Sequence, residues 1–305
     1  MIQTDIGPLD GNSWESLIQL VFKKKHDTYQ EMIASPGDLG IEGVVLVDGI
    51  AIQCYCPNED YDTKTLYQKQ RDKITKDIGK LSINEKELVK HLGDCIIRQW
   101  IFITPRIAKH EIHAHARIQE KNVKEKKLEF ISDDFQILIK DLDFYIYDIR
   151  QLQMIGGEQL CFSNSTGEKI TEPELTTEYD DNICEKNKIR SVINEIYKPK
   201  NHDILNELTK KNYLDGYEIL RRIFNQSQEL YERIAKLVNN FESEVEELSI
   251  TWEDSPQKLI TKVEEKLIAR FNNCCHISKI EHEDLVSITK HMVAKWIAEC
   301  PMRIE

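Results

Sequence analysis

The sequence has no long apolar run. No window approaches the roughly 18 consecutive apolar residues that a bilayer-spanning helix needs, and the mean hydropathy is -0.49. Residues 1–10 also lack the basic stretch followed by an apolar stretch that marks a secretory signal. We therefore expect a cytoplasmic chain with no membrane partner.

Cysteine, proline and glycine are sparse as well. The 305 residues include 8 Cys, 8 Pro and 12 Gly, and the cysteines form no dense, evenly spaced framework. This pattern argues against a disulfide scaffold and favours a reducing compartment. Because 40% of the residues are hydrophobic and 31% are charged, a disordered chain is excluded too. The composition predicts a folded, helix-rich protein.

Positive charge is in deficit. The 41 Lys and Arg residues stand against 53 Asp and Glu, which gives a net charge of -12 and excludes a free-standing polyanion binder. Residues 156–185 alone carry eight acids and one lysine, and they lack a hydrophobic period. We predict that 156–185 is an acidic linker or loop between a domain at 1–155 and a domain at 186–305.

The two halves differ in their hydrophobic period. The first half mixes helix and strand patterns and predicts an α/β layer architecture. Its expected helices are 14–22, 66–81 and 106–120, and its expected strands are the hairpin 44–54 and the segments 100–104 and 128–131. The second half has a period near 3.6, which predicts a helical bundle that assembles or binds partners. Its expected helices are 189–197, 203–211, one long helix at 219–248, 256–271 and 282–300.

The predicted hairpin carries the most informative pattern. Asp48-Gly49 between apolar runs favours a type I′ turn, whose two central residues both need positive φ. A two-residue loop would pair Val44 with Gln53 and Glu42 with Tyr55. Strand alternation then divides the hairpin into two faces, with Glu42, Val44, Gln53 and Tyr55 on one and Val45, Ile52 and Cys54 on the other.

An acid facing a polar residue across two strands suits metal-dependent phosphodiester hydrolysis. Divalent metals take hard oxygen ligands that converge on one point, and a nearby cation steadies the developing charge. The alternative interpretation of Glu42 and Gln53 is a polar edge on an ordinary hairpin.

Residues 37–43 read Gly-Asp-Leu-Gly-Ile-Glu-Gly, and Gln53 follows the hairpin turn. This pattern resembles the core of the PD-(D/E)XK, or restriction-endonuclease-like, nucleases. It is most similar to their Mrr-type branch, whose pattern runs G-D-G-G-I-D-G, then a hairpin, then Q-x-K. Asp38 matches the first Asp, and Glu42 stands in place of the metal-binding Asp. The resemblance implies that Asp38 and Glu42 bind Mg²⁺ or Mn²⁺, and that Gln53 orients water or metal.

Tyr55 stands where this family has its Lys. Residues 53–57 resemble the Y-Q-C-Y-A-P variant of nuclease-like effectors in bacterial defence operons, including three-component systems with ABC-type or SMC-like ATPases. In that variant the lysine is either supplied from elsewhere or lost. The resemblance also implies that Glu15 is a helical acid that joins the metal site, and that residues 100–105 form the next core strand.

A lysine stripe follows the hairpin. Lys69, Lys73, Lys76 and Lys80 are separated by four, three and four residues, so on a helix they share one narrow face. This stripe is expected to lie along a DNA backbone, or else to bring Lys73 or Lys76 to the metal site. The alternative is the ordinary solvated face of an amphipathic helix.

Other metal and nucleotide patterns are weak. His110, His113 and His115 do not share one helical face, and Cys274-Cys275-His276 lacks the second ligand pair of a zinc finger. No G-x-x-x-x-G-K-[ST] loop occurs, so we do not expect this chain to be the ATPase itself.

We therefore expect a restriction-endonuclease-like α/β core followed by an all-α helical domain. The expected function is a metal-dependent DNA endonuclease effector of bacterial anti-phage defence, controlled by oligomerisation or by an ABC/SMC-type ATPase with a small third subunit. The catalytic candidates are Glu15, Asp38, Glu42, Gln53, Tyr55, Lys73 and Lys76, and the DNA-binding candidates are Lys69, Lys73, Lys76 and Lys80. Two alternatives stay open: an inactive nuclease-fold sensor or adaptor that binds nucleic acid or partner proteins, and a scaffold protein in which the hairpin match is accidental.

Overall fold

The computed structural model describes residues 1–32, 39–163, 177–299 and 302–304. The chain divides into two compact units, Met1–Leu152 and Gln153–Glu305. Within the described residues, no helix combines the length and the apolar character that crossing a bilayer requires.

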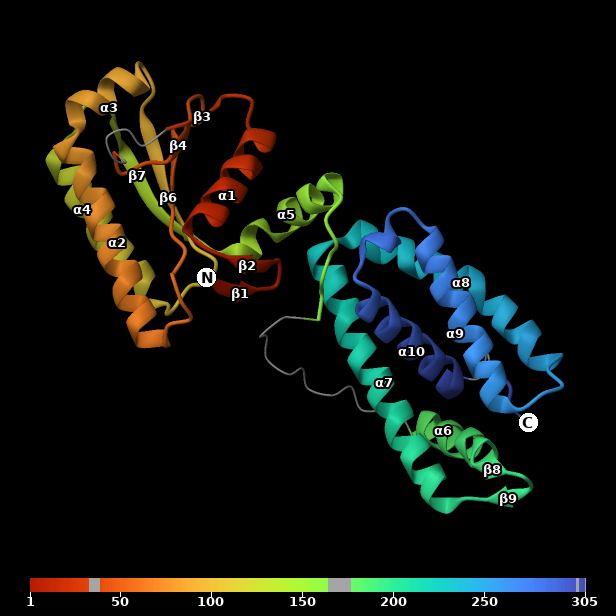
Figure 1. Cartoon of the computed structure of the whole chain (residues 1–305). Coiled ribbons are helices and arrows are strands. Elements are labelled where there is room, and N and C mark those ends of the chain that lie inside the picture. The colour runs from red at the N-terminus through yellow and green to blue at the C-terminus, as the bar shows by residue number, and fades with distance from the viewer. Residues whose placement is uncertain (33–38, 164–176, 300–301, 305) are drawn as a thin grey trace. The chain divides into compact units, whose positions relative to one another are not determined.

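The first unit is a five-stranded mixed sheet with helices on both faces (Figure 1). The strand order is β3-β4-β5-β6-β7; β3, β4 and β5 pair antiparallel, whereas β5, β6 and β7 pair parallel. The sheet strands are β3 (Tyr29–Glu31), β4 (Gly43–Val45), β5 (Ile50–Cys54), β6 (Ile97–Ile103) and β7 (Ile131–Lys140). The helices are α1 (Gly11–Lys25), α2 (Thr63–Ile83), α3 (Glu85–Leu92), α4 (Glu111–Lys126) and α5 (Leu142–Gly156), and a small hairpin of β1 (Ile2–Thr4) and β2 (Gly7–Leu9) precedes them.

Two separate hydrophobic clusters fill the two faces of this sheet. Val44 and Ala51 belong to the cluster that includes residues of α2, α3 and α4, whereas Val45 and Ile52 belong to the cluster that includes residues of α1 and α5. Neighbouring strand residues thus point to opposite layers, as the pleat requires. The α/β layer architecture predicted from the sequence is confirmed at this level.

The hairpin has the predicted faces but a different register. Glu42 lies opposite Gln53, because Val44 pairs with Ala51, whereas the sequence predicted Val44 opposite Gln53. The turn spans residues 46–49 and has a positive φ only at Gly49, so it is not a two-residue type I′ turn. The carbonyl oxygen of Gly49 accepts hydrogen bonds from strand β6, which holds this longer turn in place. A shift of two residues leaves every side chain on its predicted face.

Two predicted elements of this unit have different bounds. Helix α4 begins at Glu111 and not at 106, because Gln70 bonds the carbonyl oxygen of Arg106 (2.6 Å) and the backbone N–H of Ala108 (3.2 Å), which holds that segment outside the helix. The predicted strand 128–131 is also wrong: strand β7 begins at Ile131 and continues to Lys140.

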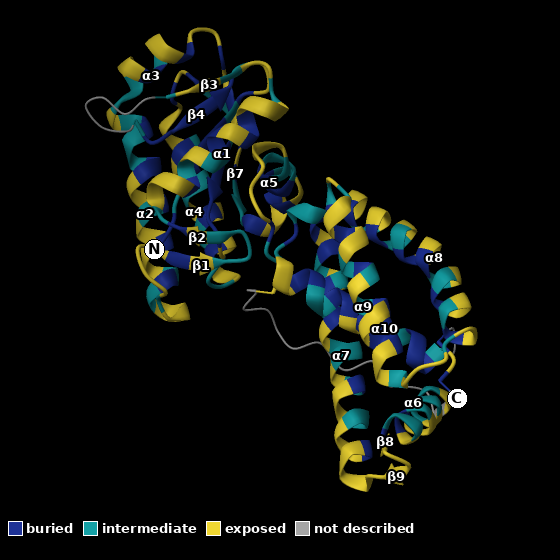
Figure 2. Ribbon diagram, turned by 45° about the vertical axis from the view of Figure 1, so that its right-hand side comes forward, coloured by how far each residue is buried: buried dark blue, intermediate teal, exposed yellow. Residues whose placement is uncertain are grey.

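In its described residues, the second unit is helical apart from short connections and one hairpin of β8 (Val192–Ile193) and β9 (Ile196–Tyr197). Its α-helices are α6 (Thr177–Arg190), α7 (Pro199–Gln226), α8 (Gln228–Ile250), α9 (Pro256–Asn273) and α10 (His282–Glu299), with a short 3₁₀ helix at Ile277–Lys279. A single hydrophobic cluster joins these helices, and Figure 2 shows buried residues along their inward sides. Trp296 is part of this core and is fully buried.

Three sequence predictions for this half are wrong. The long helix 219–248 is interrupted at Ser227, whose extended backbone separates α7 from α8. Residues 189–197 end α6 and form the β8–β9 hairpin, since Asn194 and Glu195 adopt positive φ at its turn. The acidic segment 156–185 becomes helical at Thr177, and its residues 164–176 lie outside the described residues.

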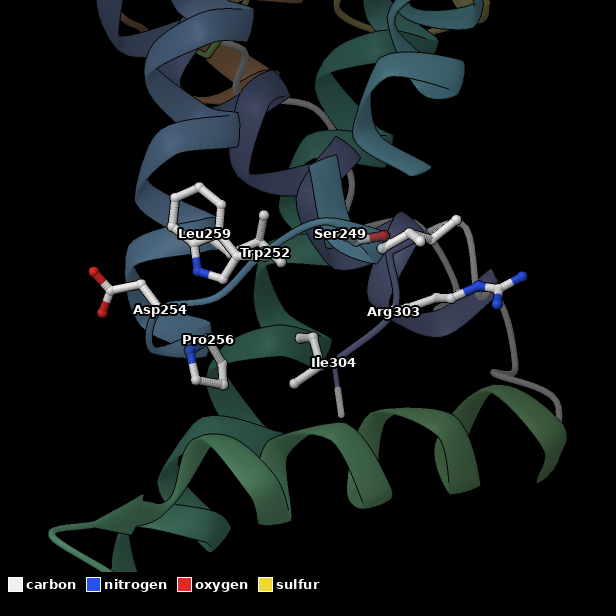
Figure 3. A pocket seen from close by; sticks show the side chains of 8 residues that line it. Ser249, Trp252, Asp254, Pro256, Leu259, Arg303 and Ile304 are labelled. Carbon is white, nitrogen blue, oxygen red and sulfur yellow. The ribbon is translucent and has the colours of Figure 1, made fainter. Parts of the chain in front are cut away.

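The end of the chain packs against the second unit's core. Met302 and Ile304 are buried. Trp252, Arg303 and Ile304 line a cavity of about 280 Å³ (Figure 3). Trp252 is only partly buried there and packs against the same hydrophobic cluster.

Candidate functional site

The backbone of Glu42 is held by three other segments. Its N–H donates to the carbonyl oxygen of Ile52 on β5 (2.8 Å). Its carbonyl oxygen accepts from the N–H of Met32 (2.8 Å) and from the side-chain amide of Gln19 on α1 (2.9 Å). These bonds fix Glu42 directly before β4 and connect it to β5, to Met32 and to α1.

The Glu42 carboxylate is buried beside Gln53. Glu42 is 8% exposed, and Gln53 is fully buried. One carboxylate oxygen accepts from the side-chain amide of Gln53, and the other accepts from the backbone N–H of Cys54 at 2.7 Å. The amide oxygen of Gln53 is buried without a hydrogen-bond partner in the structure as described, which is unusual for a native polar atom. The sequence prediction that Glu42 and Gln53 lie on one face is confirmed.

Glu15 and Lys73 are charged neighbours that affect the pKa of Glu42. Burial raises the pKa of Glu42 to about 7, and the hydrogen bond from the Cys54 N–H opposes the rise. The charge of Glu15 raises the same pKa further, whereas the charge of Lys73 lowers it. A second acid and a lysine therefore lie within electrostatic reach of the buried carboxylate.

Helix α2 approaches this segment through Gly40. Gly40 has a φ of +90°, and a Cβ at this position would overlap the backbone carbonyl oxygen of Asp77 on α2. The indole N–H of Trp100 donates to the carbonyl oxygen of Gly40 at 2.9 Å. Glycine is required here both for its conformation and for the close contact. The contact sets α2 against the chain two residues before Glu42.

Asp77 is a site residue that sequence reasoning missed. It is fully buried, and its carboxylate pairs with the ammonium groups of Lys73 (2.7 Å) and Lys80 (2.8 Å). A buried carboxylate is stable in the ionised form only when such cations compensate it. The signal in the sequence was an acid with lysines four residues before and three residues after it.

The lysine stripe consequently has two kinds of members. Lys73 and Lys80 are partly buried against Asp77, whereas Lys69 and Lys76 are exposed. The ammonium group of Lys69 lies 4.6 Å from the centre of the Tyr61 ring. Of the two lysines expected to reach the metal site, the structure brings Lys73 toward Glu42 and leaves Lys76 on the surface.

Tyr55 and Asp38 are the two remaining catalytic candidates. The Tyr55 ring stacks on Phe102 with a centroid separation of 5.9 Å, and burial raises the pKa of Tyr55 to about 12. Tyr55 thus packs among the aromatic residues on the α2 side of the sheet. Asp38 lies outside the described residues.

The donor atoms at Glu42 fit a hard divalent cation. A carboxylate, a buried amide oxygen without a partner and a second acid nearby are the oxygen ligands that Mg²⁺ and Mn²⁺ take. Within the described ranges, no group of three or more His, Cys, Asp and Glu side chains is placed to hold a metal ion. Of His110, His113 and His115, which the sequence did not favour as a metal site, His115 bonds the hydroxyl of Thr75 at 2.9 Å.

Comparison of the chain with protein-family models, with curated proteins and with solved structures finds no match. The geometry around Glu42 is therefore the basis for assigning a function.

Proposed function

We propose that this protein is a metal-dependent DNA endonuclease with a restriction-endonuclease-like core in its first unit. The observation that carries the proposal is the buried pair of Glu42 and Gln53 within electrostatic reach of Glu15 and Lys73. These residues come from the position directly before β4, from β5 and from helices α1 and α2, and they supply the oxygen ligands and the cation that phosphodiester hydrolysis needs.

In this proposal Glu42, Glu15 and the amide oxygen of Gln53 hold Mg²⁺ or Mn²⁺. When bound, the metal acts as a Lewis acid on the phosphate and lowers the pKa of a bound water. Glu42 must lose its proton to serve as a ligand, and Lys73 favours this ionised form. Lys73 is also the cation available to the charge that develops on the phosphate.

Asp77 has a supporting part in the same scheme. Its carboxylate holds Lys73 and Lys80 by ion pairs of 2.7 Å and 2.8 Å, and its backbone contacts Gly40. Asp77 thereby fixes the ammonium group of Lys73 relative to the segment that carries Glu42. We assign it as a positioning residue, because its own carboxylate is already satisfied by the two lysines.

DNA binding is assigned to the exposed lysines. Lys69 and Lys76 lie on the surface of α2 and are available to backbone phosphates. Because the chain has a net charge of -12, we expect it to bind DNA weakly by itself. The resemblance of residues 53–57 to nuclease-like effectors of bacterial defence operons is the basis for proposing a role in anti-phage defence, with activity switched on by oligomerisation or by a partner ABC/SMC-type ATPase and a small third subunit.

Plasmid cleavage tests the proposal. The full chain is incubated with supercoiled plasmid and Mn²⁺ over a range of protein concentrations, beside Glu42→Gln, Lys73→Ala and a chelator control. Glu31→Gln on β3 and Lys90→Ala on α3 are the matched controls, because both residues are exposed and lie outside the site. Cleavage lost with chelator and in Glu42→Gln but kept in Glu31→Gln is the expected result. Cleavage that survives Glu42→Gln refutes this assignment.

A second candidate is an inactive sensor or adaptor that binds nucleic acid or partner proteins. Both Glu42 carboxylate oxygens already accept hydrogen bonds from within the protein, and Tyr55 packs on Phe102 at the position of the family lysine. This arrangement is complete without a metal. DNA binding that needs no Mn²⁺, together with no cleavage at any protein concentration, would favour this candidate.

A further inference from the structure

The second unit contains a cavity of about 470 Å³ formed by α7, α8 and α10. Small-molecule sites commonly have volumes of about 300–1,000 Å³ and lie between the helices of bundles. Its walls are Tyr213, Tyr217, Leu220, Arg221, Phe224, Tyr231, His291, Met292, Lys295 and Glu299. Most of these side chains are apolar or aromatic, and a few are polar, which is the composition of a ligand site.

Aromatic rings dominate the α7 wall. Tyr213, Tyr217 and Phe224 recur at spacings of four and seven residues, which places them on one face of the helix. Tyr217 is 42% exposed and Phe224 is 48% exposed, so their rings are open to a ligand. Tyr231 on α8 contacts Phe224 edge to face, with ring centroids 5.2 Å apart. Such surfaces favour a flat, unsaturated ring that can stack on them.

His291 is a buried polar wall residue of this cavity. It is 3% exposed, and its Nδ1 lies 2.5 Å from the carbonyl oxygen of Tyr213. A carbonyl oxygen only accepts, so Nδ1 carries the proton and Nε2 is the acceptor. Burial lowers the pKa of His291 to about 4, which keeps the ring neutral. In the part of the chain that is described, Nε2 has no hydrogen-bond partner.

The helices approach closely around this histidine. A Cβ on Gly216 of α7 would overlap the Cβ of His291 on α10. Glycine in the interior of a helix is destabilising relative to alanine, so its position here has a packing reason. The close contact fixes the ring beside the α7 aromatic residues. A fixed acceptor of this kind selects a ligand with an N–H donor.

Arg221 supplies the charge at the same cavity. It is exposed, and it forms no ion pair or hydrogen bond with any described residue. The other cation, Lys295, pairs with Glu299 at 3.6 Å. An arginine fork without a carboxylate partner suits a phosphate, which it can bind through two parallel hydrogen bonds.

We propose that this cavity binds a nucleoside phosphate, with the base against Tyr217 and Phe224, a base amino group donating to His291 Nε2, and the phosphate on Arg221. The aromatic rings, the acceptor on His291 and the guanidinium of Arg221 thus bind three different parts of one ligand. An apolar helix from a second copy of the chain could cover the rings, but it would use neither the arginine fork nor the buried acceptor. This binding site is independent of the nuclease proposal, because it lies wholly in the second unit.

Isothermal titration calorimetry of the full chain with AMP tests the proposal, with adenosine and inorganic phosphate as separate probes. AMP is expected to bind with a Kd on the order of 0.1 mM, so that a tenfold loss of affinity can still be measured. Arg221→Gln should weaken AMP at least about tenfold and leave adenosine unchanged, because it removes only the phosphate contact. Phe224→Ala should weaken both AMP and adenosine. Arg233→Gln is the control, since Arg233 is also exposed and its partner is Glu229 outside the cavity.

Three results would overturn this site. The first is no heat of binding with AMP up to about 10 mM, a range that covers even weak sites. The second is AMP affinity that Arg221→Gln and Phe224→Ala leave unchanged while circular dichroism shows the variants folded. The third is a dimer that Phe224→Ala dissociates in a chain that does not bind AMP. None of these measurements involves DNA cleavage, so failure here and failure of the nuclease proposal are distinguishable.

Discussion

Glu42 in the first unit and Asp284 in the second are both buried acids, and they have different surroundings. Asp284 in α10 is fully buried, and its carboxylate accepts the backbone N–H of Phe162 at 2.6 Å. Burial raises the pKa of Asp284, and hydrogen bonds from Phe162 and Ser163 oppose the rise. Glu42 in the first unit also accepts a backbone N–H, but Gln53, Glu15 and Lys73 surround it as well.

This comparison separates a structural acid from a candidate catalytic one. Asp284 secures the segment after α5 to the first turn of α10, a role that needs only an acceptor. Glu42 lies near a second acid and a lysine. Shifted pKa values within such clusters are common at catalytic sites. Burial alone therefore does not identify a site, and the nearby second acid and lysine are what make Glu42 the candidate.

Neutralising Glu42 is expected to have the largest effect on cleavage, and neutralising Asp284 is the comparison. Glu42→Gln should reduce plasmid cleavage at least about 1,000-fold, because it removes a metal ligand while keeping the shape of the side chain. Asp284→Asn should leave the rate per folded molecule unchanged. Initial rates of nicking with Mn²⁺ measure both variants. Equal losses in the two variants would show that Glu42 has no special chemical role.

Removing the cation near Glu42 is expected to have the next largest effect. Lys73→Ala should lower cleavage about 100-fold, the size of loss seen when one charge-stabilising donor is deleted. Lys90→Ala, on the exposed surface of α3, should leave cleavage unchanged. The same nicking assay compares the two. If Lys76→Ala on the surface of α2 costs more than Lys73→Ala, the assignment of the site cation is wrong.

Asp77 connects stability with the site. Asp77→Asn should lower the free energy of unfolding by about 2–4 kcal/mol, because it leaves the partly buried Lys73 and Lys80 without their shared counter-charge. Asp72→Asn is the matched control, since Asp72 is exposed on the same helix. Urea unfolding measures the loss, and equal midpoints for the two variants would contradict the role of Asp77.

In the second unit, Asp284→Ala should lower the free energy of unfolding by about 1–3 kcal/mol. The substitution leaves the N–H of Phe162 buried without an acceptor, and that desolvation penalty sets the size of the effect. Thermal unfolding followed by circular dichroism checks it. A variant as stable as the wild type would mean that Phe162 finds another acceptor.

The last expected effect is a pH dependence of stability that Glu42 introduces. Its pKa is raised to about 7 in the folded protein, so between about pH 4.5 and 7 the folded state keeps a proton that the unfolded state has released. The free energy of unfolding should therefore fall as pH rises through this window, by at most about 1.4 kcal/mol per pH unit, and then level off. Glu42→Gln removes this contribution, so urea midpoints of the variant should fall less over the window than those of the wild type. Parallel curves for the two proteins would contradict the raised pKa.

Sequence reasoning reached the faces of the hairpin but not its register. The period of two puts Glu42 and Gln53 on one side for a two-residue loop and for the observed four-residue turn alike. The pairing itself depends on hydrogen bonds from β6, a strand that is distant in sequence. Asp77 was missed although it lies three residues after Ile74 and four before Leu81, on the apolar side of α2, because an acid next to several lysines was counted only as part of a charged helix. Its burial follows from the contact of α2 with Gly40.

The break between α7 and α8 was hidden for a related reason. The apolar period continues across Ser227, and the flanking glutamine residues are compatible with helix. Only the backbone of Ser227 marks the end of one helix and the start of the next. The helical character of the second half was thus readable from the sequence, and the packing of its helices was not.

Mn²⁺ binding tests the central claim most directly. Room-temperature electron paramagnetic resonance counts free Mn²⁺ at pH 8, where Glu42 is ionised, in the presence of wild type, Glu42→Gln or Glu31→Gln. We predict that wild type and Glu31→Gln bind Mn²⁺ with equal affinity and that Glu42→Gln loses at least about tenfold in affinity. Equal binding by all three proteins, or binding by none, would contradict a metal site at Glu42.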